Sequence, residues 1–209
     1  MPMVVAIVLA AGASSRFGPT NKLLAEVGGK PMVVRVVEAI AASPVGEIII
    51  VTGRDRDQIE DVLRQSPIRF AHNDAWQNGM ASSIRTGVAA LAATIEAAFI
   101  VPGDMPFLTA HVVVALLNEF EQTGRHSIVF PTTLTGEQRN PVLWPARFFG
   151  ELADLEGDRG AKHLLQKHSG AALAVPFSDE QVFADVDTVG ELEQARTDHP
   201  ALGGMRPWR

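Results

Sequence analysis

Short apolar runs alternate with longer segments of helical spacing along this chain, and that alternation constrains the fold more than any other feature. The runs are rich in β-branched or aromatic residues and end at glycine, proline or polar residues, as strands do. They cover residues 4–10, 47–53, 68–73, 97–103 and 127–131. A strand–helix–strand order predicts an α/β fold with a mainly parallel sheet and helices on both faces. Ligands of such sheets bind at the carboxyl ends of the strands.

The segments between these runs carry helix-start signals. Pro31 is placed as the first helical residue before "MVVRVVEAIAAS", and Thr109 is placed to cap "AHVVVALLNEFEQTG". In "DRDQIEDVLRQ" charged residues surround an apolar stripe that includes Ile59. A further helix is expected to open near Ala81. These helices would cover the sheet predicted above.

Composition narrows the class of protein. The chain has 209 residues, 46% of them hydrophobic, so we expect one domain over residues 1–197 and a loosely structured tail over 198–209. A formal net charge of -6 argues against a nucleic-acid groove. The absence of cysteine excludes disulfides and thiolate zinc sites. Because the apolar start over residues 3–11 is too short to span a membrane and lacks the basic flank of a signal peptide, we predict a soluble cytoplasmic protein.

The first predicted turn, "LAAGASSRFGPTNKLL" (residues 9–24), consists largely of small residues. Ala11 and Gly12 would let a ligand approach the backbone, whose N–H groups bind phosphate oxygens. Arg16 and Lys22 add positive charge suited to a polyphosphate. A tight turn with two solvated cations is the alternative. The motifs Gly-x-Gly-x-x-Gly and Gly-Lys-Ser/Thr are absent here, which argues against a Rossmann dehydrogenase and a P-loop NTPase.

Three aspartates are candidate ligands of a divalent cation. Asp104 lies in "VPGDMPFL", just past an apolar run and therefore at the carboxyl end of a predicted strand. A hard cation such as Mg2+ binds one or two carboxylates together with phosphate oxygens and water. Asp185 and Asp187 are the candidate partners; they flank Val186 in a short predicted strand, and only one of them is expected to face the metal directly. The alternatives are local turn bonds for Asp104 and a helix cap for one of the pair, a role that Thr188 could share.

The combination of "LAAGASSRFGPTNKLL", "GGKPMVVRVVEAI" and "VPGDMPFL" resembles the nucleotidyltransferases of the sugar-nucleotide and molybdopterin type. "GMASSIRTGV" and "LEGDRGAKHLL" resemble the branch that includes molybdenum cofactor cytidylyltransferase. The resemblance covers residues 4–197 and implies a Rossmann-like three-layer fold. The turn signals over residues 131–177 suggest an inserted subregion, which the family uses for the acceptor. The guanylyl branch tends to carry a second glycine at the position of Ala11, and the cytidylyl branch tends to carry alanine. A methyl group there would narrow the base pocket against a purine, so CTP is expected rather than GTP.

The resemblance also implies roles for individual residues. The implied catalytic residues are Arg16, Lys22 and Asp104, and the implied Mg2+ ligands are Asp104, Asp185 and Asp187. The implied nucleotide-binding residues are Leu9, Ala10, Ala11, Gly12, Ser14, Arg16, Lys22, Asn73, Gly79 and Ser83. The implied acceptor-binding residues are Arg139, Asn140, Asp158, Arg159 and Lys162, although Arg139-Asn140-Pro141 stands where relatives often carry Gly-His-Pro. As alternatives, Ser82 and Ser83 are ordinary first-turn residues, and Arg139, Arg159 and Lys162 are surface charges.

The resemblance therefore implies Mg2+-dependent transfer of a cytidylyl group from CTP to molybdopterin. The terminal phosphate of molybdopterin would attack the α-phosphorus in line, and pyrophosphate would leave. The same fold using GTP, or a sugar-1-phosphate acceptor, is the alternative within the enzyme class. A non-catalytic nucleotide-binding or delivery partner of a molybdoenzyme is the alternative outside it, and Asp104 with the Asp-x-Asp pair favours the enzyme. A molybdoenzyme or its chaperone is the expected partner, with no nucleic acid and no membrane.

Overall fold

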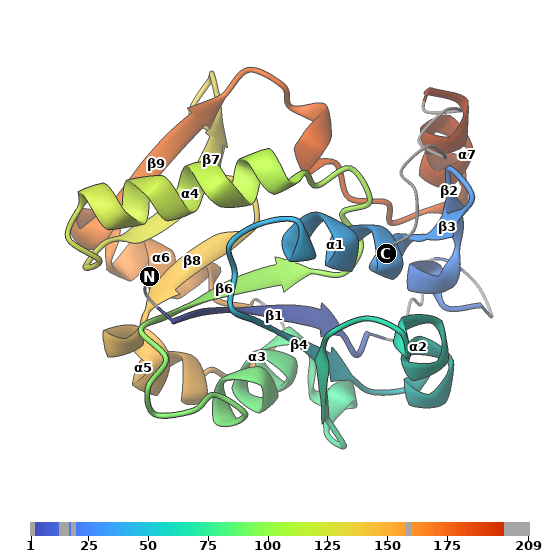
Figure 1. The fold of residues 1–209 in the computed structure, drawn as a ribbon, viewed down its shortest axis with the longest axis horizontal. Helices are drawn as coiled ribbons and strands as arrows, with labels where there is room; N and C mark the ends of the chain where they lie inside the picture. Colours follow the sequence, from blue (N-terminus) through green and yellow to red (C-terminus); the bar gives the residue numbers. More distant parts are fainter. Residues whose placement is uncertain (1–2, 13–16, 18–19, 158–159, 199–209) are drawn as a thin grey trace.

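A seven-stranded sheet forms the centre of the protein, with the strand order β5-β4-β1-β6-β8-β7-β9 (Figure 1). The structure is a computed structural model that describes residues 3–12, 17, 20–157 and 160–198. β8 runs antiparallel to both of its neighbours, and the other pairs in the sheet are parallel. The strands are β1 (Val4–Ala10), β4 (Glu47–Thr52), β5 (Arg69–His72), β6 (Ala97–Pro102), β7 (Ile128–Thr133), β8 (Val142–Pro145) and β9 (Ala172–Phe177). The predicted α/β fold with a mainly parallel sheet is therefore confirmed.

Helices lie on both faces of this sheet, with α1 and α4 on one side and α3 and α5 on the other (Figure 1). The α-helices are α1 (Met32–Ala41), α2 (Arg56–Leu63), α3 (Met80–Ala89), α4 (Ala110–Gln122), α5 (Phe149–Ala153), α6 (Lys162–Lys167) and α7 (Val189–Asp198). Short 3-10 helices are η1 (Lys22–Leu24), η2 (Trp76–Asn78), η3 (Ala146–Phe148), η4 (Ser169–Ala171) and η5 (Gln181–Phe183). A separate two-stranded ribbon pairs β2 (Glu26–Val27) with β3 (Lys30–Pro31). No helix in the described part of the chain is both long enough and apolar enough to cross a membrane.

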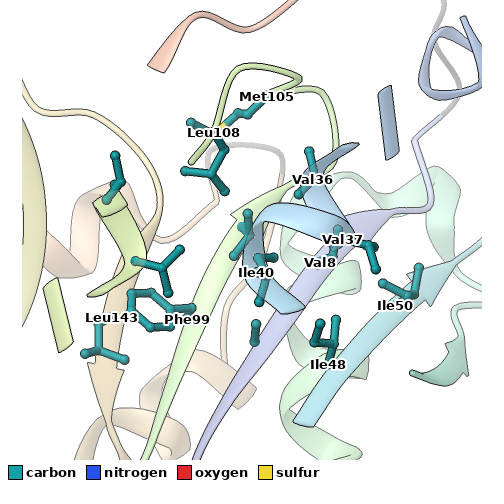
Figure 2. Close-up of a cluster of buried hydrophobic side chains, with 14 of the residues drawn as sticks. Val8, Val36, Val37, Ile40, Ile48, Ile50, Phe99, Met105, Leu108 and Leu143 are labelled. Carbon is teal, nitrogen blue, oxygen red and sulfur yellow. The ribbon is translucent and has the colours of Figure 1, made fainter. Parts of the chain in front are cut away.

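The buried side chains of β1 alternate between the two faces. Val4, Ala6 and Val8 pack with α1, α2 and α4 in one cluster, whereas Ile7 packs with α3, α5 and α6 in another. Figure 2 shows the first cluster, in which Val8 lies beside side chains of α1 and β4. Because both faces of the strand are buried, the sequence of β1 is a continuous apolar run and not an alternation of apolar and polar residues.

The five predicted strands and the predicted helices at 32–41, 56–63, 80–89 and 110–122 are present in the structure, with differences at their ends. Pro31 is the residue before α1 rather than its first helical residue, because its backbone is extended. Thr109 stands at the N-cap of α4, but its side chain makes no capping hydrogen bond. The predicted tail over 198–209 lies outside the described residues except for Asp198, which ends α7.

The region expected to form an inserted subregion contributes strands to the main sheet. β7, β8 and β9 extend the sheet beyond β6, and the connection before β8 brings Asn140 to the sheet edge where the ligand cleft lies. A third, small hydrophobic cluster includes Phe17, Val27 and Val186, and it joins α7 to the two-stranded ribbon. This cluster matters for the site because Val186 lies between two of the candidate metal ligands.

Candidate active site

A cleft of about 660 Å³ lies at the carboxyl ends of β1 and β6. Its walls come from the loop after β1, from η1, from the corner between η2 and α3, and from the segment that precedes α7. The ends of β1 and β6 meet closely, since the N–H of Gly103 donates to the carbonyl oxygen of Leu9 at 3.1 Å. A Cβ at position 103 would lie 2.8 Å from that oxygen, so only glycine fits this approach without a shift. The cleft therefore lies where the topology predicts a ligand.

Lys22 joins two carboxylates at the floor of this cleft. Its Nζ lies 2.5 Å from Oδ2 of Asp104 and 2.6 Å from Oδ1 of Asp187. The three side chains are only 15%, 18% and 24% exposed, respectively. Burial by itself would lower the pKa of the Lys22 ammonium, but the charges and hydrogen bonds of Asp104 and Asp187 outweigh burial and raise it. Lys22 is therefore positively charged in the folded protein.

The position of Lys22 is fixed by the start of η1. The side-chain oxygen of Asn21 accepts a hydrogen bond from the backbone N–H of Leu23 at 3.0 Å, which caps the short helix. The amide nitrogen of Asn21 donates to Oδ2 of Asp55 at 3.0 Å and ties the loop to the start of α2. The lysine is thus held at the cleft by a backbone that is itself anchored.

Asp185 and Asp187 both line the cleft, and the short strand predicted for them is wrong. Their segment has no regular secondary structure. It is fixed by the N–H of Val186, which donates to the carbonyl oxygen of Asp104 at 3.1 Å, and by the buried Val186 side chain. Both aspartates therefore lie near Asp104 at the same edge of the sheet.

Neither aspartate of this pair is needed as the cap of α7. The N–H of Glu191 donates to the hydroxyl of Thr188 at 3.2 Å, and the Glu191 carboxylate accepts from the N–H groups of Asp187 and Thr188 at 2.8 Å each. This reciprocal pattern is a capping box. The side chains of Asp185 and Asp187 are thus available for the cleft.

The carboxylates provide the kind of oxygen donors that a divalent cation prefers. Oδ1 of Asp104 is buried and has no hydrogen-bond partner among the described residues, so one negatively charged oxygen is left for another ligand. Partial burial raises the pKa of Asp185, and the negative charges of Asp104 and Asp187 add to this rise. Oxygen donors of this kind suit Mg2+ or Mn2+. However, no ready-made group of three ligands is formed within the described residues.

Most of the predicted nucleotide-binding residues line the cleft. Leu9, Ala11, Gly12, Gly79 and Ser83 line it, whereas Ala10 is buried in the core. Ser14 and Arg16 lie outside the described residues. Trp76, Gln77 and Met80 also line the cleft and were not among the residues expected from the sequence. The only signal for them was their place just before the helix start at Gly79.

Asn73 is placed behind the cleft rather than in it. It is 2% exposed, and its amide nitrogen donates to the hydroxyls of Ser82 at 2.8 Å and Ser83 at 3.1 Å. Its amide oxygen accepts from the N–H of Ala75 at 3.0 Å. With its polar groups engaged, Asn73 orients the first turn of α3 instead of contacting a nucleotide.

The methyl group of Ala11 is packed close to Gly53. Ala11 lines the cleft but is only 2% exposed, and a Cβ added at Gly53 would approach the Ala11 Cβ to 2.7 Å. A methyl group packed in this way leaves little surface for contact with a base. The preference for CTP over GTP gains no support from this methyl group and continues to rest on the resemblance.

A second cavity of about 360 Å³ adjoins the first and shares Pro102, Asn140 and Asp185 with it. Arg139 also lines this cavity, and its guanidinium pairs with Glu137, with one hydrogen bond of 2.8 Å. Lys162 is exposed and lines neither of the two cavities in the described part of the chain. Asp158 and Arg159 lie outside the described residues. Two of the five predicted acceptor residues, Arg139 and Asn140, are thus placed at a cavity.

The sequence profile of the MobA-like NTP transferase domain matches residues 6–172. The chain belongs to this family. Nicotine blue oxidoreductase from Paenarthrobacter nicotinovorans is 29% identical over 197 residues, which cover 92% of this chain and 96% of that protein. The bifunctional protein GlmU from Carboxydothermus hydrogenoformans is 33% identical over 134 residues, which cover 62% of this chain and only 28% of GlmU.

Solved structures agree with the fold of this MobA-like protein. The homologue of Mycobacterium tuberculosis rv0371c from Mycobacterium sp. strain JC1 superposes with a TM-score of 0.81 at 24% identity, covering 94% of this chain and 96% of that one. At this identity the likeness shows the fold alone. The family match adds the activity class, which is nucleotidyl transfer.

Gly53 lies where the loop after β1 packs closely against η2, and a substitution there tests whether the cleft depends on this packing. A Cβ at this position would lie 2.7 Å from Cβ and O of Ala11 and 2.9 Å from Cβ of Trp76. Gly53→Ala should push these segments apart, lower the free energy of unfolding by about 1–3 kcal/mol and weaken nucleotide binding. Denaturant unfolding and calorimetric titration measure the two effects.

Gly46→Ala is the control, because a Cβ there would lie 3.5 Å from the carbonyl oxygen of Val4, an ordinary contact distance. Unchanged stability and nucleotide affinity in Gly53→Ala would show that the two segments do not depend on their close packing.

Proposed function

We propose that this MobA-like protein transfers a cytidylyl group from CTP to molybdopterin, with release of pyrophosphate. The observation that carries the transferase chemistry is the Lys22 ammonium between Asp104 and Asp187 at the carboxyl edge of the sheet. It combines a cation for phosphates with carboxylates for a metal in one cleft. The choice of CTP and molybdopterin is supported by the resemblance of "LAAGASSRFG" and "GMASSIRTGV" to the cytidylyl branch.

The proposed reaction is a direct in-line displacement. An oxygen of the acceptor phosphate forms a bond to the α-phosphorus of CTP as the bond from that phosphorus to the β-phosphate oxygen breaks. The departing pyrophosphate carries the electron pair, so no covalent enzyme intermediate is required. The protein's task is to hold the two reactants in line and to offset their negative charge.

Individual residues have distinct proposed roles in this reaction. Lys22, together with Arg16 and the backbone N–H groups near Gly12, binds the β- and γ-phosphates of the nucleotide. Asp104 and Asp187 hold Mg2+ with the help of Asp185, and the ion when bound supplies positive charge to the phosphates. The first turn of α3, which Asn73 orients, presents Ser83 to the nucleotide.

The second cavity is the proposed place for the body of the acceptor. Asp185 and Asn140 line both cavities, so a molecule in the second cavity reaches the first beside the carboxylates. Arg139 and Asn140 are the proposed acceptor contacts, with Asp158, Arg159 and Lys162 as further ones. A sugar-1-phosphate is the alternative acceptor. We further propose a cytoplasmic protein that delivers its product to a molybdoenzyme or the chaperone of one.

A nucleotide panel tests the proposal. In a thermal-shift series with Mg2+, CTP at about 100 times its Kd should raise Tm by about 5–10 °C, and GTP, ATP and UTP should raise it less. Pyrophosphate release is then measured with molybdopterin as the acceptor. A larger shift and faster release with GTP would assign the chain to the guanylyl branch. Binding without transfer to any acceptor would favour a non-catalytic delivery partner.

Oxidoreductase activity is the second candidate. It is favoured by the near full-length match to a protein named nicotine blue oxidoreductase. Against it stands the Lys22–Asp104–Asp187 arrangement, which suits phosphates and a metal and which hydride transfer does not require. The absence of Gly-x-Gly-x-x-Gly after the first strand also argues against a standard dinucleotide site. Oxidation of NADH or NADPH with a dye acceptor, followed by absorbance, distinguishes the two candidates.

A further inference from the structure

We propose that Lys22 occupies, in the nucleotide-free protein, the place between Asp104 and Asp187 that the divalent cation takes during the reaction. The ammonium and the metal would then compete for the same carboxylates. The inference rests on the proposed function in one respect only, which is that Asp104 and Asp187 are metal ligands. It adds that the free protein keeps its metal site closed with one of its own side chains.

The geometry of the site carries this inference. The ammonium lies within 2.5 and 2.6 Å of one oxygen of each carboxylate, which is full contact distance. A divalent ion that binds both oxygens would lie against the ammonium. The site is largely shielded from water, and like charges at such a distance repel strongly there. Both cations therefore cannot share the two oxygens, and Lys22 must leave before the ion binds both.

The charges of the neighbouring groups explain why the lysine stays when no ion is bound. Asp104, Asp185 and Asp187 all line one cleft, and close carboxylates repel one another. The Lys22 ammonium offsets part of this negative charge. It also leaves Oδ1 of Asp104 buried and without a partner among the described residues, so the lysine satisfies the site only in part.

The Lys22 ammonium can reach a second set of oxygen partners within the same cleft when a nucleotide is bound. Lys22 and the backbone at Gly12 line one cavity, and the side chain is a flexible four-carbon stem. Nucleotide phosphates in that cavity would offer the ammonium new oxygen partners at the moment the ion takes the carboxylates. Nucleotide and metal would consequently favour each other's binding, and Lys22 would couple them.

Mn2+ binding to the nucleotide-free protein tests the competition directly, with free Mn2+ measured by electron paramagnetic resonance. Removing the ammonium in Lys22→Met should tighten Mn2+ binding by about tenfold or more, since the competitor is gone and the carboxylates remain. Lys22→Gln, which keeps a hydrogen-bond donor without the charge, should show the same gain. Adding Asp104→Asn to Lys22→Met should abolish it.

Lys30→Met is the matched control. The Lys30 ammonium also pairs with a carboxylate, Glu38, at 2.6 Å, but neither residue lines the cleft. This variant should bind Mn2+ like the unmodified protein. Equal or weaker Mn2+ binding by both Lys22 variants would overturn the inference and would mean that the lysine holds the carboxylates in place for the ion.

A measurement on the unmodified protein tests the competition between Lys22 and the ion without any substitution. Reductive methylation followed by mass spectrometry should modify Lys22 slowly in the free protein and faster when saturating Mn2+ is added without nucleotide. The rate at Lys30 should not change. Unchanged methylation of Lys22 on saturation with Mn2+ would overturn the inference.

Failure of the competition between Lys22 and the ion can be distinguished from failure of the proposed transferase function. A protein that shows the competition but transfers no nucleotidyl group contradicts the transferase proposal alone. A protein that transfers the group, yet whose Lys22 variants show no gain in Mn2+ affinity, contradicts only the competition.

Discussion

Asp104→Asn should lower turnover in nucleotidyl transfer by about 100-fold or more while the protein stays folded. The Asp104 carboxylate combines the Lys22 ion pair with a buried oxygen that has no partner among the described residues, and loss of a group that stabilises a charged transition state costs this much. Asparagine keeps the size and one oxygen, so the effect reports the charge. Pyrophosphate release at saturating nucleotide and acceptor measures it.

Asp61→Asn is the control for this variant. Asp61 is an exposed aspartate of α2 that pairs with Arg64 and does not line the cleft. Its turnover should match that of the unmodified protein. Near-normal, metal-dependent turnover in Asp104→Asn would refute the role given to this carboxylate.

The central strands of the sheet could be predicted from the sequence. β1, β4 and β6 correspond to the apolar runs at 4–10, 47–53 and 97–103, because both faces of these strands are buried. The runs at 68–73 and 127–131 also form strands, which are β5 and β7. β8 was missed because the turn signals around it suggested an inserted subregion, although its four residues are all buried. β9 was missed because the turn signals around it suggested a loop-rich insertion.

The sequence predicted those site residues whose place follows from their position after a strand. It did not predict contacts between residues that are far apart along the chain. Asp104 and Lys22 follow strands β6 and β1, so topology alone places both at the ligand edge. Their direct pairing could not be predicted, since 82 residues separate them. Asn73, which follows a strand, was expected from the resemblance to contact the nucleotide. A polar residue at such a position can face the ligand or, as here, bond to the buried side of a helix start.

The orientation of Asp185 and Asp187 depended on tertiary contacts as well. The chain has no regular secondary structure here, yet it keeps the alternation of a strand, because Val186 is buried in a hydrophobic cluster while Asp185 and Asp187 on either side of it line the cleft. The buried Val186 side chain and its backbone bond to Asp104, and not pairing with another strand, hold this segment in place.

This geometry separates the two aspartates in a way that kinetics can measure. Asp187 pairs with Lys22 and lines only the first cavity, whereas Asp185 lines both cavities. Asp187→Asn should therefore lower turnover by about 100-fold, as expected for loss of a charged ligand at the reacting phosphates. Asp185→Asn should act mainly on the acceptor and raise its KM by about tenfold, with a smaller loss of turnover.

Steady-state kinetics with nucleotide and acceptor varied in turn distinguish these two patterns. Glu180→Gln is a useful comparison, because Glu180 lines the second cavity but not the first. It should raise the KM of the acceptor without changing the KM of the nucleotide. If Asp185→Asn instead lowered turnover as much as Asp187→Asn and left the KM of the acceptor unchanged, both aspartates would serve the reacting phosphates. The acceptor would then have to reach the α-phosphate without relying on Asp185, past Asn140, which also borders both cavities.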